Sequence, residues 1–370
     1  SSSSSSSSSS VRLLSSSSSS QRLGVINNVM SYARVAETTS EQGSLDAPSI
    51  YLEQVTIQTS SLDSSSREAA LATAELISNA SNLNTQETST KVVGAMGNIR
   101  ASVAQNGDTS EQASTSARIE TSAIKVGSAM LSESVDGQDP IEVSANNLTV
   151  VGKKVSGSDL GSTSVSSSST GVSVNFSSQI TSNNSLDVVT LYVPDSLYPG
   201  NVSTGTVSVE IFETTSSSSS SSSSPLSVSN LNDNDPIYVF IPLAQTDENT
   251  TTTCQYWDEA TQQWLTDGLT FVREETNSIG VHGVLCATTH LTSFGSVRTG
   301  TDTRVGINTF GKDDIKAEAF SWENPVMVFC SILFASYVII AIVALAYDID
   351  KARNYDLQEK SVHFWRGVNQ

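Results

Sequence analysis

The stretch CQYWDEATQQWLTDGLTFVREETNSIGVHGVLCATTHLTSF, from Cys254 to Phe294, is the most informative part of the chain. It holds two cysteines, aromatic residues soon after the first, and a histidine close to hydroxyl residues. The sequence before it contains GTVSVEIF, in which Val207, Val209 and Ile211 would share one face of a strand. We therefore expect the stretch to belong to a β-rich domain.

Strand patterns recur from Asp136 onward. The further candidates are IEVSANNLTVV, GVSVNF, LDVVTLYV, DPIYVFIPL, LTFVRE, GVHGVLCA and TSFGSV, with Gly, Asn, Asp and Pro turns between them. Short strands separated by such turns favour a β-sandwich over alternating βαβ units. We predict a sandwich over residues 140–298.

Upstream, the apolar period is that of helices. Apolar residues recur at spacings of three and four in the sets Leu23, Ile26, Met30, Ala33; Val92, Met96, Ile99, Val103; and Ile119, Ala123, Val126, Met130. Ser65 and Glu68 have the spacing of a capping box, which would start another helix. About four helices are predicted over residues 21–139, after a serine-rich, low-complexity segment at residues 1–20.

One long apolar run follows the sandwich. Residues 326–347 read VMVFCSILFASYVIIAIVALAY, without a charge, which is long enough to cross about 30 Å of hydrocarbon. A buried helix is the weaker alternative, because Pro325 begins the run and charged residues flank it. The prediction is a stalk at 299–324, one transmembrane helix at 325–347 and a cytoplasmic tail at 348–370.

Charge and glycosylation motifs bear on location. A net charge of −19 argues against a nucleic-acid partner. Basic residues flank the apolar run on both sides, so loop charge leaves the orientation open. Asn-x-Ser/Thr sequons all precede the run and favour an extracellular N-terminus; they are Asn79, Asn147, Asn175, Asn183, Asn201 and Asn249.

The cysteines also indicate an oxidising compartment. Cys330 falls within the apolar run, which leaves Cys254 and Cys286 as the extracellular pair. We expect these two to form a disulfide, with two buried free thiols as the alternative. His282 and His363 have no cysteine or second histidine nearby at metal-ligand spacing, and neither a metal nor a cofactor is expected.

The motif residues resemble a known family. Cys254, the pair Tyr256 and Trp257, Trp264, Gly268, Cys286 and then His290, Leu291 and Thr292 resemble the G-protein-coupled-receptor proteolysis site, the GPS motif. This motif ends the GAIN domain of adhesion receptors and polycystin-1-like proteins. The resemblance implies an α+β membrane protein with a helical GAIN subdomain A, a β-sandwich GAIN subdomain B with the GPS motif at 254–298, and one transmembrane helix.

The resemblance also implies self-cleavage. His290 would act as general base on the hydroxyl of Thr292, whose oxygen would attack the carbonyl of Leu291. Tyr256, Trp257, Trp264 and Gly268 would brace the turn. The cut protein would persist as two noncovalently associated fragments of itself. The alternative is a domain that keeps the motif as packing and is not cut.

The two-cysteine form of the motif and the run HLTSFG resemble the polycystin-1 branch more than adhesion receptors. This implies a single-pass anchoring or mechanosensory subunit in the plasma membrane, in a cilium. Its partner would be a polycystin-2-type channel or another membrane helix. Two alternatives stay open: the N-terminal part of an adhesion-type receptor, and a pure anchor for an extracellular matrix or glycoprotein filament such as a ciliary mastigoneme. Beyond self-cleavage, no enzyme activity is expected.

Overall fold

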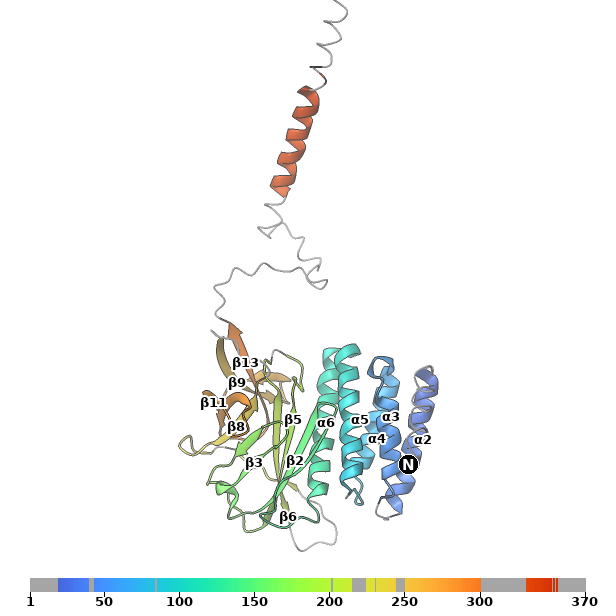
Figure 1. The fold of residues 1–370 in the computed structure, drawn as a ribbon, viewed down its shortest axis with the longest axis vertical. Coiled ribbons are helices and arrows are strands. Elements are labelled where there is room, and N and C mark those ends of the chain that lie inside the picture. The colour runs from blue at the N-terminus through green and yellow to red at the C-terminus, as the bar shows by residue number, and fades with distance from the viewer. Residues whose placement is uncertain are drawn as a thin grey trace, which may run out of the picture. The chain divides into compact units, whose positions relative to one another are not determined.

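A computed structural model describes residues 19–39, 43–83, 85–200, 202–214, 224–229, 231–243, 250–300, 331–347, 349 and 351. The chain separates into two compact units, residues 1–301 and residues 302–370. The first unit holds both sheets and the labelled helices of Figure 1, and it contains the motif residues.

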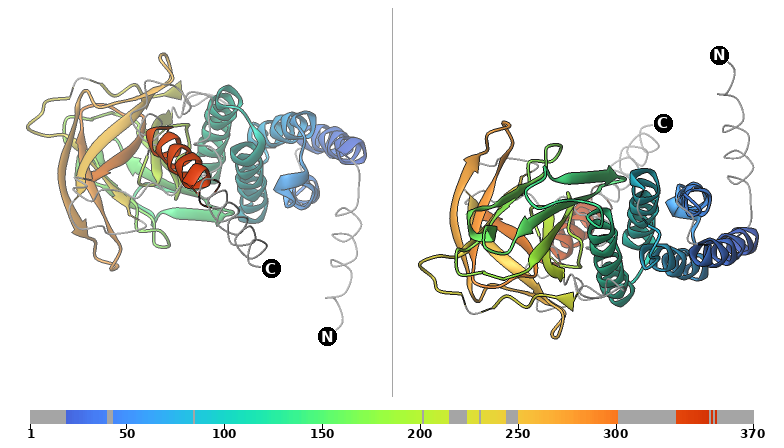
Figure 2. Two further views of the ribbon diagram at one scale, coloured as in Figure 1. Left: turned by 90° about the horizontal axis from the view of Figure 1, so that it is seen from above. Right: turned by 90° about the horizontal axis from the view of Figure 1, so that it is seen from below.

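The N-terminal half of the first unit is helical. Its helices are α2 (Ser19–Thr38), α3 (Asp46–Thr56), α4 (Ser64–Ser78), α5 (Gln86–Asn106) and α6 (Thr109–Met130). They lie side by side, with α6 nearest the sheets and α2 farthest away, as Figures 1 and 2 show. The predicted stripes face inward, since Ile26, Met96 and Ile119 are fully buried. The short helix α3 was not predicted.

Three of the helices begin with side-chain caps. Asp63, Thr85 and Asp108 each accept a hydrogen bond from the backbone N–H three residues later. The predicted capping box at Ser65 and Glu68 is therefore wrong: α4 begins at Ser64, because the Asp63 carboxylate already satisfies the N–H of Ser66. That same hydrogen-bonding partner, Ser66, holds the pKa of Asp63 below its usual value.

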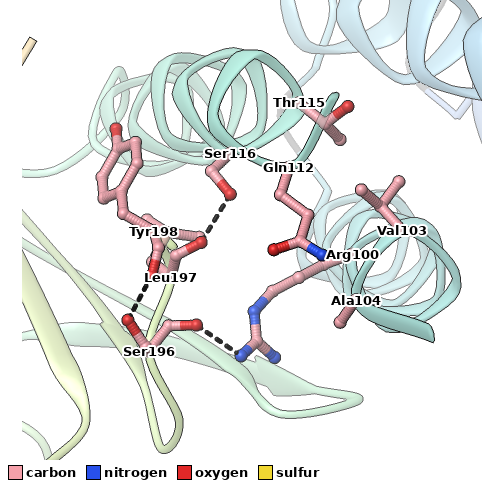
Figure 3. A pocket seen from close by; sticks show the side chains of 9 residues that line it. All are labelled: Arg100, Val103, Ala104, Gln112, Thr115, Ser116, Ser196, Leu197 and Tyr198. Carbon is pink, nitrogen blue, oxygen red and sulfur yellow. Dashed lines mark hydrogen bonds between the residues drawn. The ribbon is translucent and has the colours of Figure 1, made fainter. Parts of the chain in front are cut away.

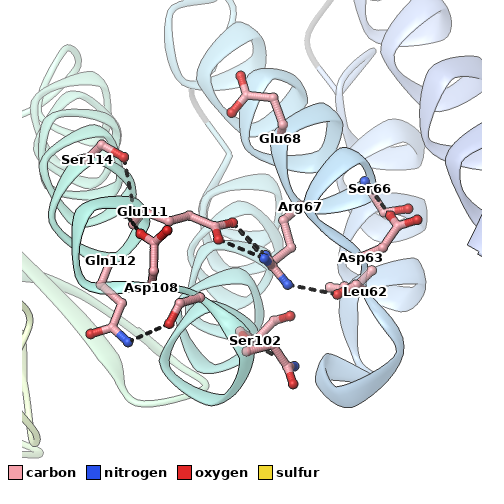
Figure 4. A network of polar contacts seen from close by, with 12 residues as sticks. Leu62, Asp63, Ser66, Arg67, Glu68, Ser102, Asp108, Glu111, Gln112 and Ser114 are labelled. Carbon is pink, nitrogen blue, oxygen red and sulfur yellow. Dashed lines mark hydrogen bonds and ion pairs between the residues drawn. The ribbon is translucent and has the colours of Figure 1, made fainter.

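An ion pair joins α4 to α6. The guanidinium of Arg67 donates to both carboxylate oxygens of Glu111 at 2.7 and 2.9 Å through Nη2. Its Nη1 donates to the carbonyl of Leu62 at 3.0 Å, as Figure 4 shows. Because the Arg67 side chain is only 6% exposed, this two-pronged pair fixes the relative position of the two helices better than a surface pair would.

The C-terminal half consists of antiparallel strands. They are β1 (Ile141–Ala145), β2 (Leu148–Ser156), β3 (Ser164–Ser166), β4 (Ser173–Asn175), β5 (Ser185–Val193), β6 (Thr206–Thr214), β7 (Ser224–Pro225), β8 (Ile237–Pro242), β9 (Thr250–Asp258), β10 (Gln263–Leu265), β11 (Leu269–Thr276), β12 (His282–Thr288) and β13 (Ser293–Gly300). One sheet has the order β1-β2-β5-β6-β13-β9-β10, with β7 beside β6. The other has the order β11-β12-β8-β4-β3.

Two apolar cores give the unit three layers. The sheets pack face to face around residues such as Val188 and Val209 from the larger sheet and Val239 and Val284 from the smaller. The outer face of the larger sheet packs against the helices. Gly127 of α6 allows this close approach, since a Cβ there would lie 2.4 Å from a methyl group of Val189. The predicted order of helices followed by antiparallel strands is confirmed.

The strand predictions need two corrections. IEVSANNLTVV is a hairpin rather than one strand, because Asn146 and Asn147 adopt φ of 47° and 63° in the two-residue turn between β1 and β2. In addition, β3, β7, β9 and β10 were not predicted. Strand β9 reads TTTTCQYWD, whose run of threonines lacks the apolar contrast that marks a half-buried strand.

In the second unit, residues 331–347 are helical. Within the part of the chain that the structure describes, we find no helix of the length and hydropathy that membrane crossing requires. The predicted transmembrane helix at 325–347 lies partly outside the described residues, as do most of the predicted stalk and tail.

Candidate functional site

The site is the turn at which the chain passes from one sheet to the other. Strand β12 ends at Thr288 in the smaller sheet, and β13 begins at Ser293 in the larger. The Thr288 hydroxyl donates to the carbonyl of His290 at 2.9 Å and accepts from the His290 N–H at 3.3 Å. The Leu291 N–H donates to the carbonyl of Val228 at 3.2 Å. The backbone on either side of the Leu291 carbonyl is thus held by specific hydrogen bonds.

The His290 ring lies in an aromatic pocket. The Tyr256 and His290 rings meet in a T-shaped arrangement with their centroids 4.6 Å apart, and the centroid of the Phe294 ring lies 6.1 Å from that of His290. Nε2 of His290 is buried and has no hydrogen-bond partner among the described residues. Burial lowers the pKa of His290, which favours the neutral ring, whose nitrogen lone pair can accept a proton.

Gly268 lies next to this ring. Its φ is +74°, a conformation that side-chain-bearing residues rarely adopt, and a Cβ there would stand 3.5 Å from Nδ1 of His290. The glycine of the motif is therefore required by the backbone conformation of the turn before β11, since a Cβ at this distance would make only an ordinary contact with the imidazole.

The hydroxyl of Thr292 is hydrogen-bonded to Trp257 rather than to His290. Its hydroxyl donates to the backbone carbonyl of Trp257 at 3.2 Å, and its own carbonyl accepts from the N–H of Val209 at 3.3 Å. Transfer of the hydroxyl proton to His290 therefore requires that the hydroxyl leave the Trp257 carbonyl. Strand β9, through Trp257, sets the resting position of the candidate nucleophile.

The adjacent aromatic residues of β9 serve opposite faces of the larger sheet. Tyr256 faces the core between the sheets, with His290, whereas Trp257 packs with the helices. Trp257 stacks on Tyr198 at 4.5 Å, and Trp264 meets both rings edge-on. The indole N–H of Trp264 donates to the carbonyl of Pro199 at 3.2 Å. Tyr198 was not predicted as part of the site, since no motif in its surroundings points to it.

The predicted disulfide between Cys254 and Cys286 is confirmed. It joins β9 of the larger sheet to β12 of the smaller, with a Cα–Cα distance of 6.0 Å. Both residues are buried. The disulfide therefore joins the two sheets four residues before His290.

Loss of this disulfide should destabilise the domain. The bond joins residues 32 apart, and closure of such a loop in the unfolded chain is worth about 3 to 4 kcal/mol. A Cys254→Ala, Cys286→Ala double variant should therefore unfold at a lower denaturant concentration, measured by tryptophan fluorescence. Chemical reduction should shift the unreplaced protein by a similar amount and leave the double variant unchanged. Equal midpoints for the two proteins would contradict a stabilising role.

The predicted glycosylation sites lie at the surface wherever they are described. Asn79, Asn147, Asn175 and Asn183 are all exposed. Asn201 and Asn249 lie outside the described residues. Exposure is what attachment of a glycan requires.

Comparisons with known proteins bear on the same region. A search of curated proteins found no match. Among solved structures, the chain is similar to the full extracellular region of zebrafish Gpr126/Adgrg6, with a TM-score of 0.38 and 13% identity. That match covers 68% of this chain and 34% of the zebrafish chain. Residues 199–296 match the family model described as GPS: GAIN subdomain B. The turn at His290 therefore lies within the residues that match this model, and helices precede them in the chain.

Proposed function

We propose that this protein is a membrane-anchored cell-surface protein that cuts its own backbone between Leu291 and Thr292 and keeps both fragments together. The observation that carries the proposal is the position of the His-Leu-Thr turn. It lies inside the region matched to the GPS motif, directly before a strand with neighbours on both sides.

The proposed reaction needs no group from outside the turn except water. The neutral ring of His290 accepts the proton of the Thr292 hydroxyl, and the freed oxygen attacks the carbonyl carbon of Leu291. The C–N bond breaks as the Thr292 nitrogen takes up the proton, which leaves an ester between Leu291 and the Thr292 oxygen. Water hydrolyses the ester to a Leu291 carboxylate, a free Thr292 amine and the restored hydroxyl.

Retention of the fragments follows from the position of β13. The strand lies between β6 and β9, and its register with β9 runs from Phe294 to Gly300. Breaking the peptide bond between Leu291 and Thr292 removes none of these ladder hydrogen bonds. The fragment from Thr292 to Gln370 would therefore remain attached to the rest of the domain until force or unfolding removed the strand.

A gel of the full chain tests the cleavage. An antibody against residues 355–370, used on a reducing, denaturing gel, should detect a small band that carries only Thr292 to Gln370. Amino-terminal sequencing of this band should begin at Thr292, which distinguishes self-cleavage from proteolysis at a site after β13. A single full-length band would overturn the proposal and leave the motif with a structural role.

We further propose a membrane anchor and a channel partner for this protein. The apolar sequence at 326–347 and the sequons before it, four of which are described and exposed, support an anchored protein with its GAIN domain outside the cell. The two-cysteine motif supports a polycystin-1-like subunit that pairs with a polycystin-2-type channel in a ciliary membrane. Copurification of such a channel with the full chain, from membranes solubilised in mild detergent, tests the pairing. Recovery without a channel but with an extracellular filament would favour the pure anchor.

A further inference from the structure

A buried carboxyl group from the helices meets the first residue of β13. Glu120 lies on α6, in the half of the domain that precedes the strands, and is more than nine-tenths buried. The Ser293 hydroxyl donates to its Oε1 at 2.6 Å, across 173 residues of sequence. Ser293 directly follows Thr292 and would be the second residue of the proposed C-terminal fragment. Glu120 therefore contacts this fragment directly.

The same carboxyl group also accepts a hydrogen bond from Tyr198, one of the aromatic residues packed beside the turn. The Tyr198 hydroxyl donates to Oε2 of Glu120, and the Tyr198 ring stacks on Trp257, whose carbonyl accepts from Thr292. The Ser208 hydroxyl lies 2.7 Å from that of Ser293 and extends the network to β6. Glu120 is thus bonded at one oxygen to the proposed fragment and at the other to the residues that position the nucleophile.

The loop that carries Tyr198 has its own attachment to the helices. Arg100 of α5 donates to the carbonyl of Ser196 at 2.9 Å, and the Ser116 hydroxyl of α6 donates to the carbonyl of Leu197. Figure 3 shows these side chains around a small pocket between α5, α6 and the loop. These bonds stop at the loop, whereas the bond from Glu120 goes on to β13. The two kinds of attachment can therefore be separated by substitution.

We propose that Glu120 is the positioning residue through which the helices hold the start of β13, so that the helical part of the domain controls how readily this strand opens. The inference deepens the proposed function, because an opened β13 is the step before the release of the fragment. It assigns the helices a direct contact with that fragment, in addition to their packing on the outer face of the sheet.

The carboxyl group also makes this contact dependent on pH. Burial raises the pKa of Glu120, and the titratable groups whose charge reaches it are Tyr198, Glu210 and Glu259; Lys125 in turn acts on Glu210. A raised pKa means that the folded state binds the proton more tightly than the unfolded state does. The contact therefore loses stability as pH rises above 4.5, the ordinary value of such a carboxyl group. Burial raises the pKa of Glu210 to about 7, which acts in the same direction.

Hydrogen exchange in an uncut protein tests the proposal independently of cleavage. In the full chain with Thr292→Ala, the protection of the β13 amides should fall at least about ten-fold when Glu120→Leu removes both hydrogen bonds. Glu120→Gln, which can donate one bond and accept the other, should preserve most of the protection. Ser116→Ala should open the loop at Leu197 and leave β13 unchanged. If Glu120→Leu does not fold, Ser293→Ala removes the same contact from the other side.

The outcomes separate this inference from self-cleavage. Unchanged protection of β13 in Glu120→Leu, or an equal loss in every strand, would overturn the role of Glu120 whatever the tail-antibody gel shows. Conversely, an uncut native protein would remove the proposed cleavage and leave the exchange result standing. Protection of β13 corrected for intrinsic exchange should fall from pH 5.5 to pH 8, and Glu120→Gln should reduce this dependence. The change in this pH dependence in the Glu210→Gln variant measures the contribution of Glu210.

Discussion

Replacing Thr292 by alanine is expected to abolish the tail-bearing fragment completely. Alanine has no oxygen that could attack the Leu291 carbonyl, and an uncatalysed peptide bond is stable on the timescale of expression. The change removes one hydrogen bond, from the Thr292 hydroxyl to the carbonyl of Trp257, which is worth about 1 kcal/mol of stability. The variant should therefore fold and accumulate as a single full-length band on the denaturing gel.

Two neighbouring substitutions control for disturbance of the turn. Thr292→Ser keeps a hydroxyl group on the β-carbon, and this variant should still be cut. Thr289→Ala removes a hydroxyl from the same turn without touching the scissile bond and should also be cut. A Thr292→Ala protein that still yields a fragment beginning at position 292 would show that another nucleophile or a separate protease makes the cut.

Replacing Phe294 by alanine should release the cut fragment from the domain. Phe294 is fully buried in the core between the two sheets, and it is the first residue of β13 that has partners on both sides, Val207 of β6 and Tyr256 of β9. Truncation of such a buried phenylalanine costs about 3 to 5 kcal/mol. In an intact chain this loss lowers stability, but in a cut chain it directly weakens the attachment of the fragment. The fraction of fragment that copurifies with the N-terminal part under native conditions should drop sharply.

Matched variants locate the effect. Phe294→Leu keeps most of the apolar volume and should retain much more fragment. Val297→Ala changes a half-buried residue of the same strand and should have a smaller effect than Phe294→Ala. Retention must be expressed per cut molecule, because a disturbed core can also slow cleavage. Equal retention in Phe294→Ala and the unreplaced protein would mean that the ladder hydrogen bonds alone hold the strand.

The elements with strong periodicity were predictable from the sequence. The stripe that contains Met96 and Ile99 gives a helix because three- and four-residue spacing places these side chains on one face. The alternation of Val207, Val209 and Ile211 gives β6 for the corresponding reason. Where that contrast is weak, as in the threonines of β9, the prediction failed although the strand carries half of the disulfide.

The sequence by itself determined the chemical groups of the site, because a motif of cysteines, aromatic residues and His290-Leu291-Thr292 is local and specific. Only the tertiary structure decided how these groups are held. Sheet register places Tyr256 beside His290 and turns Trp257 to the helices. Helix packing brings Glu120 to Ser293, and a loop between β5 and β6 brings Tyr198 to Trp257. These partners are far apart in the chain, and no local period encodes such contacts, since they arise only when the helices and both sheets have packed.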